Sequence, residues 1–539
     1  MAGGRGGSAG CTGAHALGRP GRSGAFPAEK HARSGHGTAP AAVHAQNILQ
    51  NALTFPYKAV IYKVNGLFIQ KTQTKNKLKG TLIMADAYTS VTVDFNKTTG
   101  PLRHALHCDG HTPTLAYRNL IRKDDEFRAM NFYAARTHDW ALSNPGQRMI
   151  DTHFVFPLMH LDPADPQNYY FTSSDAIINL CHSVGMKVFY RLGTSIEHSA
   201  DWGHYESHFN THPPADFEKY AEVLAGIIRH YTRGWANGYE YKDMEYWEIW
   251  NEPNLGGQCW CGDRELFIKF FVTVLKRLKS EFPELKIGGP ALSSLNLDYF
   301  NALLDACKEA GVAPDFLSWH CYSNNVRHIV DQAQVVRDLL DERGLTKTET
   351  SLNEWHFILG GWEGIQSTAS SQQRKRAITG PCSMFGIDSG AFNLSVLCEM
   401  QNTPLDSAFY YGHSNAGMWS YYDEYAHPNK NNFSMRMFGR FLAEAGEKVE
   451  TLFNPDGSVH ALAALAKNGT DGRMIVVDYR GEMPTLEVDV AGMEGATASA
   501  TVLDDGNDIV PVPVIWDGSH LILTKPCPGS AAFYVTFKK

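Results

Sequence analysis

The 539-residue chain lacks the marks of an exported, membrane-bound or metal-dependent protein. Residues 1–46 contain no apolar core of signal-peptide length. Residues 55–70 are apolar but interrupted by Lys58 and Lys63, so this stretch is too short and too charged to span a membrane. No His-x-His or His-Glu-x-x-His motif occurs. We therefore expect a cytoplasmic protein with no metal, no cofactor and no membrane partner; the alternative is an organelle transit peptide at the acid-poor N-terminus.

The ten cysteines do not form a metal site in the sequence. Cys259-Trp-Cys261 is too closely spaced for an ordinary zinc knuckle, and no second cysteine pair follows at metal-site spacing. In the absence of an export signal, free buried thiols are the expected state.

Acidic residues are almost missing from the first 83 positions. Eleven of the 49 basic residues but only one of the 57 acidic residues, Glu29, lie there, which leaves a net charge of −18 for the rest. An acidic body argues against nucleic acid as the partner. We predict that residues 1–83 are a disordered or non-native extension and that Met84 is the natural start.

From about residue 100 to residue 445, strand and helix patterns alternate. Apolar residues recur at three- and four-residue spacing between the strands, as at Tyr220, Val223 and Leu224. The expected strands are Leu102–His107, Asn131–Ala135, Lys187–Leu192, Glu245–Trp250, Lys286–Gly289, Phe316–Trp319, Glu349–Leu352 and Ala408–Tyr411. Eight such strands predict an α/β fold, a (β/α)8 TIM barrel over residues 84–445. A doubly wound sheet is the alternative, but no Gly-rich phosphate loop follows an early strand.

The C-terminal residues 446–539 have a different pattern. Short alternating strands are separated there by Asp-Gly, Gly-Asn and Pro-Gly turns. This pattern predicts an antiparallel β-sandwich, to which residues 89–95 are candidates to add a strand.

Two stretches carry an Asn-Glu pair after an apolar, strand-like run. Residues 246–254 read Tyr-Trp-Glu-Ile-Trp-Asn-Glu-Pro-Asn, and residues 351–356 read Ser-Leu-Asn-Glu-Trp-His. Glu252 would end the fourth strand and Glu354 the seventh, so that they face each other across the barrel mouth. Two opposed carboxylates are what glycosidic bond cleavage needs. A gap of about 5–5.5 Å implies retention of configuration, and about 6.5–9.5 Å implies inversion.

In these motifs the chain resembles the (β/α)8 glycoside hydrolases, and within them glycoside hydrolase family 39, the β-xylosidase and α-L-iduronidase family. The Arg136-Thr-His138-Asp139 and His320-Cys-Tyr322 strand ends are similar too. The resemblance implies that Glu252 is the acid/base and Glu354 the nucleophile. It also implies that Asn251 donates to the sugar 2-hydroxyl and that Tyr322 hydrogen-bonds the nucleophile.

Further substrate-binding candidates are strand-end and loop residues of the barrel. They are Arg136, His138, His198, His320, Trp355 and Trp419. Each has a structural alternative: the arginine in an ion pair within the barrel, His320 as a core histidine, and the tryptophans as core rings. Trp250 and Trp260 are expected to form apolar walls that keep Glu252 protonated. The chain departs from the family's pattern at Asn353-Glu354-Trp355-His356, which leaves the substrate open.

The sequence thus predicts a retaining exo-glycosidase, β-xylosidase-like, that acts on an oligosaccharide or glycoside. An α-L-iduronidase-like or β-galactosidase-like specificity is the nearest rival, because Arg136 or Arg191 could bind a uronate carboxylate. A non-catalytic carbohydrate-binding barrel is a rival of another class, although both glutamates are present. A metal-dependent barrel hydrolase lacks its motif. The sequence leaves a homo-oligomer open.

Overall fold

The structure is a computed structural model that describes residues 91–113, 123–138, 150–194, 196, 210–360, 371–413, 418–423 and 425–539. All of these residues belong to one compact unit, Ala85–Lys539. The N-terminal segment 1–83 and the candidate His198 lie outside the described residues.

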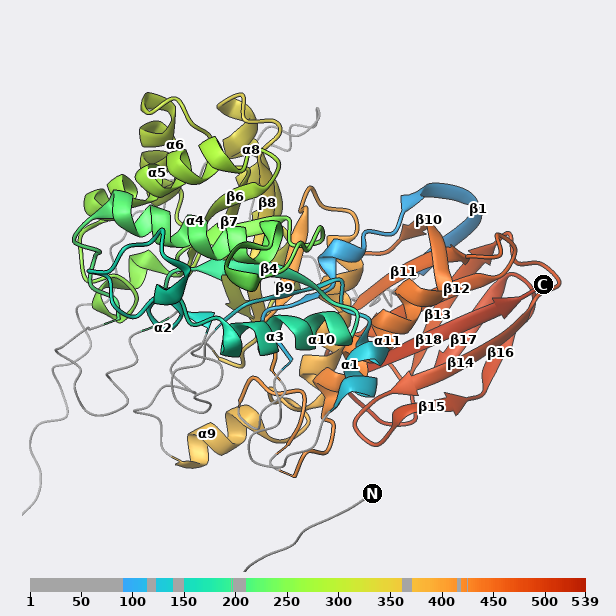
Figure 1. The fold of residues 1–539 in the computed structure, drawn as a ribbon. Coiled ribbons are helices and arrows are strands. Elements are labelled where there is room, and N and C mark those ends of the chain that lie inside the picture. The colour runs from blue at the N-terminus through green and yellow to red at the C-terminus, as the bar shows by residue number, and fades with distance from the viewer. Residues whose placement is uncertain are drawn as a thin grey trace, which may run out of the picture. The chain divides into compact units, whose positions relative to one another are not determined.

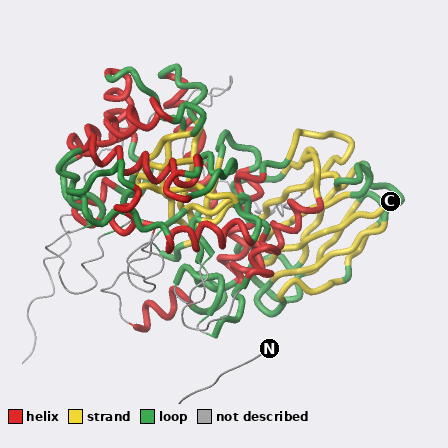
Figure 2. Tube along the Cα trace, viewed as in Figure 1, coloured by secondary structure: helices red, strands yellow, loops and turns green. Residues whose placement is uncertain are grey.

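Eight parallel strands close into a barrel, seen among the surrounding helices in Figures 1 and 2. They are β2 (Cys108–Asp109), β3 (Ala134–Arg136), β4 (Lys187–Leu192), β5 (Tyr246–Ile249), β6 (Lys286–Leu292), β7 (Phe316–Ser323), β8 (Glu349–Phe357) and β9 (Ser407–Tyr410). Strand β2 pairs with both β3 and β9, which closes the ring. The predicted (β/α)8 barrel is confirmed.

The first barrel strand begins later than predicted. The strand expected at Leu102–His107 is absent, because residues His104–Leu106 form the 3-10 helix η1 and the His107 N–H donates to the His104 carbonyl at 2.9 Å. That bond makes a local turn in place of a ladder bond to a neighbouring strand. Pairing starts only at Cys108.

Helices connect the strands, as the alternating pattern predicts. They are α1 (Asp124–Met130), α2 (Thr152–Val155), α3 (Thr172–Ser183), α4 (Phe217–Arg233), α5 (Arg264–Glu281), α6 (Leu297–Glu309), α7 (Val326–Val330), α8 (Gln332–Glu342), α9 (Ser371–Ile378), α10 (Ile387–Met400) and α11 (Lys430–Glu444), with 3-10 helices η1 (His104–Leu106), η3 (Pro166–Asn168), η5 (Trp235–Asn237) and η6 (Pro253–Gln258). Helix α4 shows how the sequence sets the ends. Asp216 caps it by accepting from the Lys219 N–H at 3.0 Å, and Gly234 ends it with a φ of 68°.

Strand β8 contains a bulge that matters for the site. Leu352 pairs with Trp319 of β7, but the next pair joins Glu354 to His320, so Asn353 is an extra residue. The pairing with β9 shifts at the same place. A bulge breaks the strict alternation of side chains, and here it allows Asn353 and Glu354 both to contact residues of the barrel interior.

The C-terminal residues form a ten-stranded sheet that is almost wholly antiparallel. Its strands, in sheet order, are β15 (Asp508–Val512), β14 (Thr497–Leu503), β18 (Ala531–Lys538), β12 (Gly472–Asp478), β11 (Val459–Ala466), β10 (Ala445–Leu452), β1 (Val91–Pro101), β13 (Thr485–Ala491), β17 (His520–Thr524) and β16 (Val514–Trp516). Strand β1 reaches the sheet from the other end of the described chain, pairing antiparallel with β10 and parallel with β13.

The central strands of this sheet are buried on both faces. In β11, Ala461 and Ala463 belong to the sheet's own core, whereas Leu462 and Ala464 belong to the core shared with the barrel. Polar pairs cross the same boundary, such as His460 Nδ1 to Glu399 Oε1 at 2.7 Å. The sheet is therefore packed firmly against the barrel's helices.

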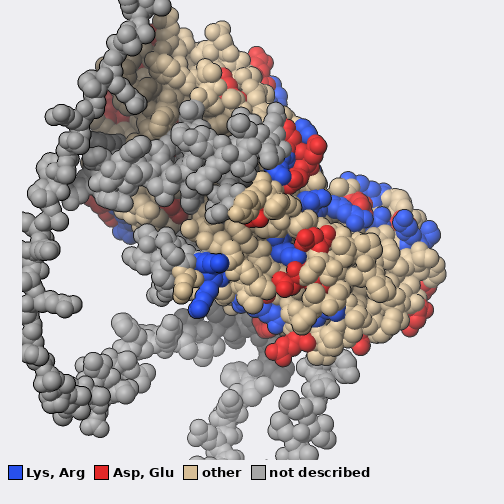
Figure 3. Space-filling model, turned by 90° about the horizontal axis from the view of Figure 1, so that it is seen from below, with Lys and Arg blue, Asp and Glu red and all other residues tan. Residues whose placement is uncertain are grey.

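The surface of the described residues carries both signs of charge. In the view of Figure 3, basic and acidic side chains lie in small mixed groups among uncharged residues. Within the described ranges, every helix is too short or too polar to cross a membrane.

Candidate active site

Glu252 stands just after β5, where the backbone turns sharply. Trp250 and Glu252 have φ values of 74° and 46°, a left-handed conformation that residues other than glycine seldom adopt. Hydrogen bonds to both neighbouring strands fix this turn. The Trp250 N–H donates to the Leu192 carbonyl at 3.0 Å, and the Glu252 N–H donates to the Ala291 carbonyl at 2.9 Å. These two hydrogen bonds hold the backbone at Glu252 in one conformation, which fixes the direction in which its carboxyl group leaves the chain.

Aromatic rings surround this turn. Trp250 and Trp260 are 2% and 0% exposed, and their rings meet edge to face at 5.2 Å. Gly193 makes the packing possible, because a Cβ there would lie 2.5 Å from the Trp250 ring. The two rings pack into the core behind this turn, whereas Glu252 keeps 18% of its side chain exposed.

Glu354 lies inside β8 and accepts hydrogen bonds on both carboxylate oxygens. Oε1 is 2.8 Å from Nη1 of Arg136 and 3.2 Å from Nε2 of His138. Oε2 accepts from the Tyr322 hydroxyl at 2.6 Å and lies 3.2 Å from Nδ1 of His320. Glu354 thus accepts from Arg136 and Tyr322, and two histidine rings lie within contact distance of its oxygens.

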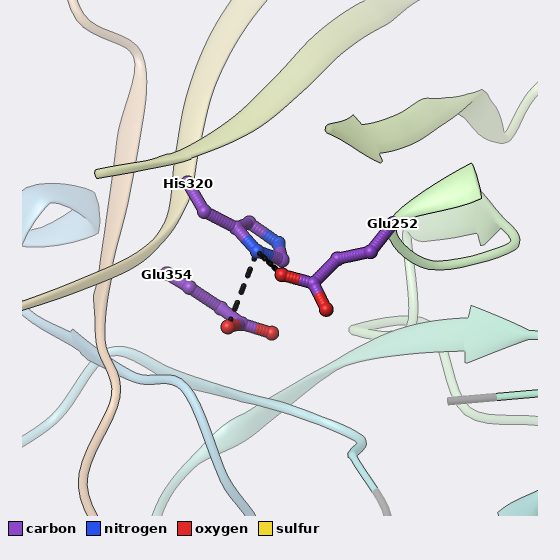
Figure 4. A group of neighbouring side chains, drawn as sticks. All are labelled: Glu252, His320 and Glu354. Carbon is purple, nitrogen blue, oxygen red and sulfur yellow. Dashed lines mark hydrogen bonds and ion pairs between the residues drawn. The ribbon is translucent and has the colours of Figure 1, made fainter. Parts of the chain in front are cut away.

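His320 lies between the two glutamates. Its Nδ1 is 2.8 Å from Oε1 of Glu252 and 3.2 Å from Oε2 of Glu354, as the dashed lines of Figure 4 mark. One carboxylate oxygen of each glutamate and one ring nitrogen of His320 all lie within 4.8 Å of one another. Among the described residues this is the one group whose atoms could hold a metal ion, and it contains the two glutamates that the sequence predicts as catalytic.

The environment separates the two carboxyl groups electrostatically. Burial, and then the nearby charge of Glu354, raises the pKa of Glu252 to about 8. Burial lowers the pKa of His320 to about 4, so that its ring is neutral at physiological pH. Burial and the charge of Glu354 raise the pKa of Tyr322 well above its usual range, which keeps its hydroxyl a donor.

A network of buried ion pairs and hydrogen bonds contacts Glu354 through Arg136. The Arg136 guanidinium donates to Glu248 through Nε at 2.7 Å and to Asn251 Oδ1 through Nη2 at 2.7 Å. Glu248 in turn accepts from the Ser318 hydroxyl at 2.6 Å and from Asn353 Nδ2 at 2.5 Å. Arg136 is a substrate-binding candidate from the sequence. In the structure it contacts Glu354 and also forms an ion pair within the barrel.

Glu248 is the site residue that the sequence reasoning missed. It is fully buried and lies in the same motif as Glu252, four residues earlier. The signal was present: in β5, Trp247 and Ile249 face the helices, so Glu248 must face the barrel interior. Tyr411, His111 and His413 were missed as well. They are buried beside His138, with His111 and His138 ring centroids 5.0 Å apart.

The two tryptophan candidates differ in position. Trp419 packs against Tyr322, with ring centroids 5.3 Å apart, and so borders the carboxylate cluster. Trp355 is fully buried in the core between barrel and helices, where its ring meets Tyr410 at 5.0 Å. The structure does not bring Trp355 to the carboxylate cluster, because β8 continues past Leu352 and its side chains alternate, so that Trp355 faces away from Glu354.

A closed parallel barrel with two carboxylates at the carboxyl ends of its strands is the architecture of the (β/α)8 glycoside hydrolases. Residues 89–342 match the family model described as Glycosyl hydrolases family 39. A β-xylosidase from Caldicellulosiruptor saccharolyticus is 30% identical over 162 residues, which are 30% of this chain and 32% of that relative. The barrel region of the chain is thus similar to glycoside hydrolase family 39.

Solved structures support the fold. A glucosidase from Croceicoccus marinus has a TM-score of 0.66 at 20% identity, and a GH39 β-xylosidase from Caulobacter crescentus has 0.59 at 15% identity. Each comparison covers 84% of this chain and 100% of the other chain. At these identities the likeness shows the barrel with its second, mostly antiparallel sheet. The sequence match to the curated β-xylosidase spans about a third of that protein's length.

Proposed function

We propose that the protein is a retaining exo-glycosidase, β-xylosidase-like, in which Glu252 is the acid/base and Glu354 the nucleophile. The observation that carries this proposal is the pair of carboxylates, of which one oxygen each lies within 4.8 Å of the other. An inverting enzyme keeps its carboxyl groups about 6.5–9.5 Å apart to admit a water molecule, whereas a retaining enzyme needs about 5–5.5 Å. The short gap supports direct attack by a carboxylate.

The unequal environments support the assignment of roles. The raised pKa of Glu252 favours a protonated side chain that can donate to the leaving oxygen. Glu354 is surrounded by Arg136, Tyr322 and His138, which favour the negative charge that a nucleophile needs.

In the first step a carboxylate oxygen of Glu354 forms a bond to the anomeric carbon of the sugar. The glycosidic C–O bond breaks, its electron pair goes to the leaving oxygen, and Glu252 supplies the proton that makes the leaving group an alcohol. Arg136 and Tyr322 then donate to an ester rather than to a carboxylate, so the charge that they balanced moves to Glu252.

In the second step Glu252 is a carboxylate and takes a proton from water. The water oxygen attacks the anomeric carbon, and the bond to Glu354 breaks, which restores its carboxylate. Two displacements return the sugar with its original anomeric configuration. Asn251 is suited to bind the 2-hydroxyl, because its Oδ1 accepts from Arg136 and its amide nitrogen is the donating end.

The sugar is proposed from the relatives. The curated relatives from Caldicellulosiruptor saccharolyticus and Geobacillus stearothermophilus are named β-xylosidases, and this name supports a β-xyloside as substrate and the release of single sugar units.

One observation favours a uronate substrate as the second candidate. Arg136 already donates to Glu248, Glu354 and Asn251 within the barrel. Arg191 pairs with Asp151, but its buried Nε and Nη1 have no hydrogen-bond partner among the described residues. An α-L-iduronidase-like enzyme would therefore depend on Arg191.

A panel of aryl glycosides of xylose, galactose, glucose, arabinose and iduronate tests the proposal. We expect the highest kcat/KM on the β-xyloside, with β-xylose as the first product in a time-resolved proton NMR spectrum. α-Xylose as the first product would mean inversion. Preference for the iduronide, abolished in Arg191→Lys, would favour the second candidate. If the protein binds glycosides but hydrolyses none of them, the result would favour the non-catalytic carbohydrate-binding barrel.

The pH profile tests the role of Glu252 separately. Glu252 donates only when protonated, so kcat/KM on the preferred glycoside should fall as the pH rises through about 8. In Glu252→Gln this fall should disappear together with most of the activity. A basic limb that is unchanged in Glu252→Gln would contradict the assignment.

A further inference from the structure

The two oxygens of the Glu252 carboxyl group have different neighbours. Oε1 faces Nδ1 of His320 at 2.8 Å, and Oε2 faces the sulfur of Cys259 at 3.8 Å. The sulfur distance is that of a weak S–H hydrogen bond. The carboxyl group is therefore asymmetric before any substrate binds.

The hydrogen bonds of His320 decide which of its nitrogens carries the proton. Nδ1 faces carboxylate oxygens of both Glu252 and Glu354, whereas Nε2 is buried and has no hydrogen-bond partner among the described residues. A proton on Nε2 would leave a buried donor unpaired and would turn the Nδ1 lone pair toward ionised Glu354. The neutral ring therefore carries its proton on Nδ1 and donates it to Oε1 of Glu252.

This tautomer of His320 determines which oxygen of protonated Glu252 carries the acid proton. Because Oε1 accepts the shorter and stronger hydrogen bond, from His320, the carboxylic acid proton resides on Oε2, which faces the weakly donating thiol of Cys259. We propose that Cys259 is a positioning residue whose thiol donates to Oε2 and holds that oxygen as the proton-carrying end of the acid. The proposal rests on the proposed role of Glu252 as the acid/base.

The chain fixes the position of this thiol. The Cys259 N–H donates to the Gly256 carbonyl at 2.8 Å, and the Cys259 carbonyl accepts from Nε1 of Trp250 at 2.8 Å. Burial raises the pKa of the thiol well above its usual range, so that it stays an S–H donor. A thiol is a weaker donor than a hydroxyl, which lets Oε2 be oriented without strongly stabilising the carboxylate.

Other charged and titratable groups also act on Glu252. They are Arg136 on β3, His320 and Tyr322 on β7, Glu354 on β8 and Tyr411 after β9. Variants at Cys259 leave all the others in place, so a change in the titration of Glu252 reports the thiol alone.

The test is the titration of Glu252 in the full chain, followed by NMR of carboxyl-13C-labelled glutamate and assigned with Glu252→Gln. Cys259→Val fills the same space without a donor and should raise the pKa of Glu252 by about half a unit, because the lost hydrogen bond favoured the carboxylate. Cys259→Ala should shift it in the same direction. The matched control is Cys261→Val, two residues on and partly exposed, which should leave the titration unchanged.

Measurements of kcat give a second test of the role of Cys259. In Cys259→Val, kcat should fall several-fold on alkyl glycosides, which need protonation, and stay nearly constant on an activated aryl glycoside. The proposal is overturned if Cys259→Val and Cys259→Ala titrate like Cys261→Val, or if they only lower the melting temperature. Because the NMR titration needs no substrate, it remains decisive even if the proposed glycosidase activity is absent.

Discussion

The two ends of the barrel interior are filled by opposite kinds of side chain, although the same strands supply both. Toward the N-terminal ends of the strands the interior is apolar, and two residues further along β3, β4, β5 and β7 it is polar or charged. On β4, Phe189 is followed by Arg191, and on β5, Tyr246 is followed by Glu248. The apolar layer consists of Cys108, Ala134, Phe189, Phe316 and Phe409, with Tyr133 and Tyr246 at its border.

The apolar layer stabilises the fold, whereas the charged layer supplies the groups that could carry out a reaction. Aromatic rings packed at centroid distances of 5.0–5.2 Å around Phe189 contribute hydrophobic and dispersion energy without polar cost. Buried charges such as Arg136, Glu248 and Glu354 lose hydration, and their mutual hydrogen bonds offset that loss only in part. Such a layer is retained where it performs a reaction. Substitutions at the two ends should therefore have opposite effects on activity and on folding.

The largest effect is expected at the charged end, for Glu354→Ala. Without the nucleophile no glycosyl-enzyme ester forms, so kcat should fall by about four to six orders of magnitude on every substrate, activated or not. Azide should rescue turnover by direct attack and give a glycosyl azide of the opposite anomer, identified by NMR. An azide product with the substrate's own configuration would show that Glu354 is not the nucleophile.

Glu252→Ala should have a smaller effect that depends on the substrate. Loss of general acid catalysis costs about 10²–10⁴-fold on glycosides with poor leaving groups, and much less on activated aryl glycosides, which depart without protonation. Azide should here attack the covalent intermediate and give a glycosyl azide of retained configuration. Equal losses on both kinds of substrate, measured as kcat/KM, would remove the acid role from Glu252.

The apolar end is tested with Phe189→Ala. Removing a ring that contacts Phe316, Phe409 and Tyr246 should lower the free energy of unfolding by about 3–5 kcal/mol, measured by urea denaturation. The folded fraction should keep its kcat within about twofold, because the ring lies one layer away from the charged residues. Phe189→Leu is the milder control. A loss of kcat without a loss of stability would erase the distinction between the two ends.

Much of this site could be predicted from sequence, because strand order and alternation determine which residues meet. The eight strand–helix repeats predict the barrel, and the two Asn-Glu motifs predict that the carboxyl groups of Glu252 and Glu354 lie close together. What failed depended on where a strand stops. The sequence pattern predicts a seventh strand that ends at Leu352, but β8 pairs with β7 as far as Phe357. Hydrogen bonding to a neighbouring strand, which a single strand's sequence does not reveal, sets that limit.

Glu248 and the bulge at Asn353 illustrate a second limit. The sequence motif drew attention to its last glutamate, whereas the structure shows that the first one balances Arg136, which in turn contacts Glu354. The bulge adds Asn353 Nδ2 as a donor to Glu248. An ion pair of residues 112 positions apart is a property of the closed barrel, and no local pattern encodes it.

The smallest effect is expected for Trp355→Phe, and it distinguishes the outer face of β8 from the inner one. Trp355 packs on Tyr410, and its indole N–H is buried without a hydrogen-bond partner among the described residues. Phenylalanine loses contact area but also removes that unpaired donor, so the free energy of unfolding should fall by only about 1 kcal/mol. KM should stay within about twofold. Trp419→Phe is the matched variant, because Trp419 borders Tyr322 and its change should raise KM several-fold while stability changes by a similar amount. An equal rise in KM for Trp355→Phe and Trp419→Phe would mean that the Trp355 ring reaches the substrate. Trp355 would then face the barrel interior and not the helices.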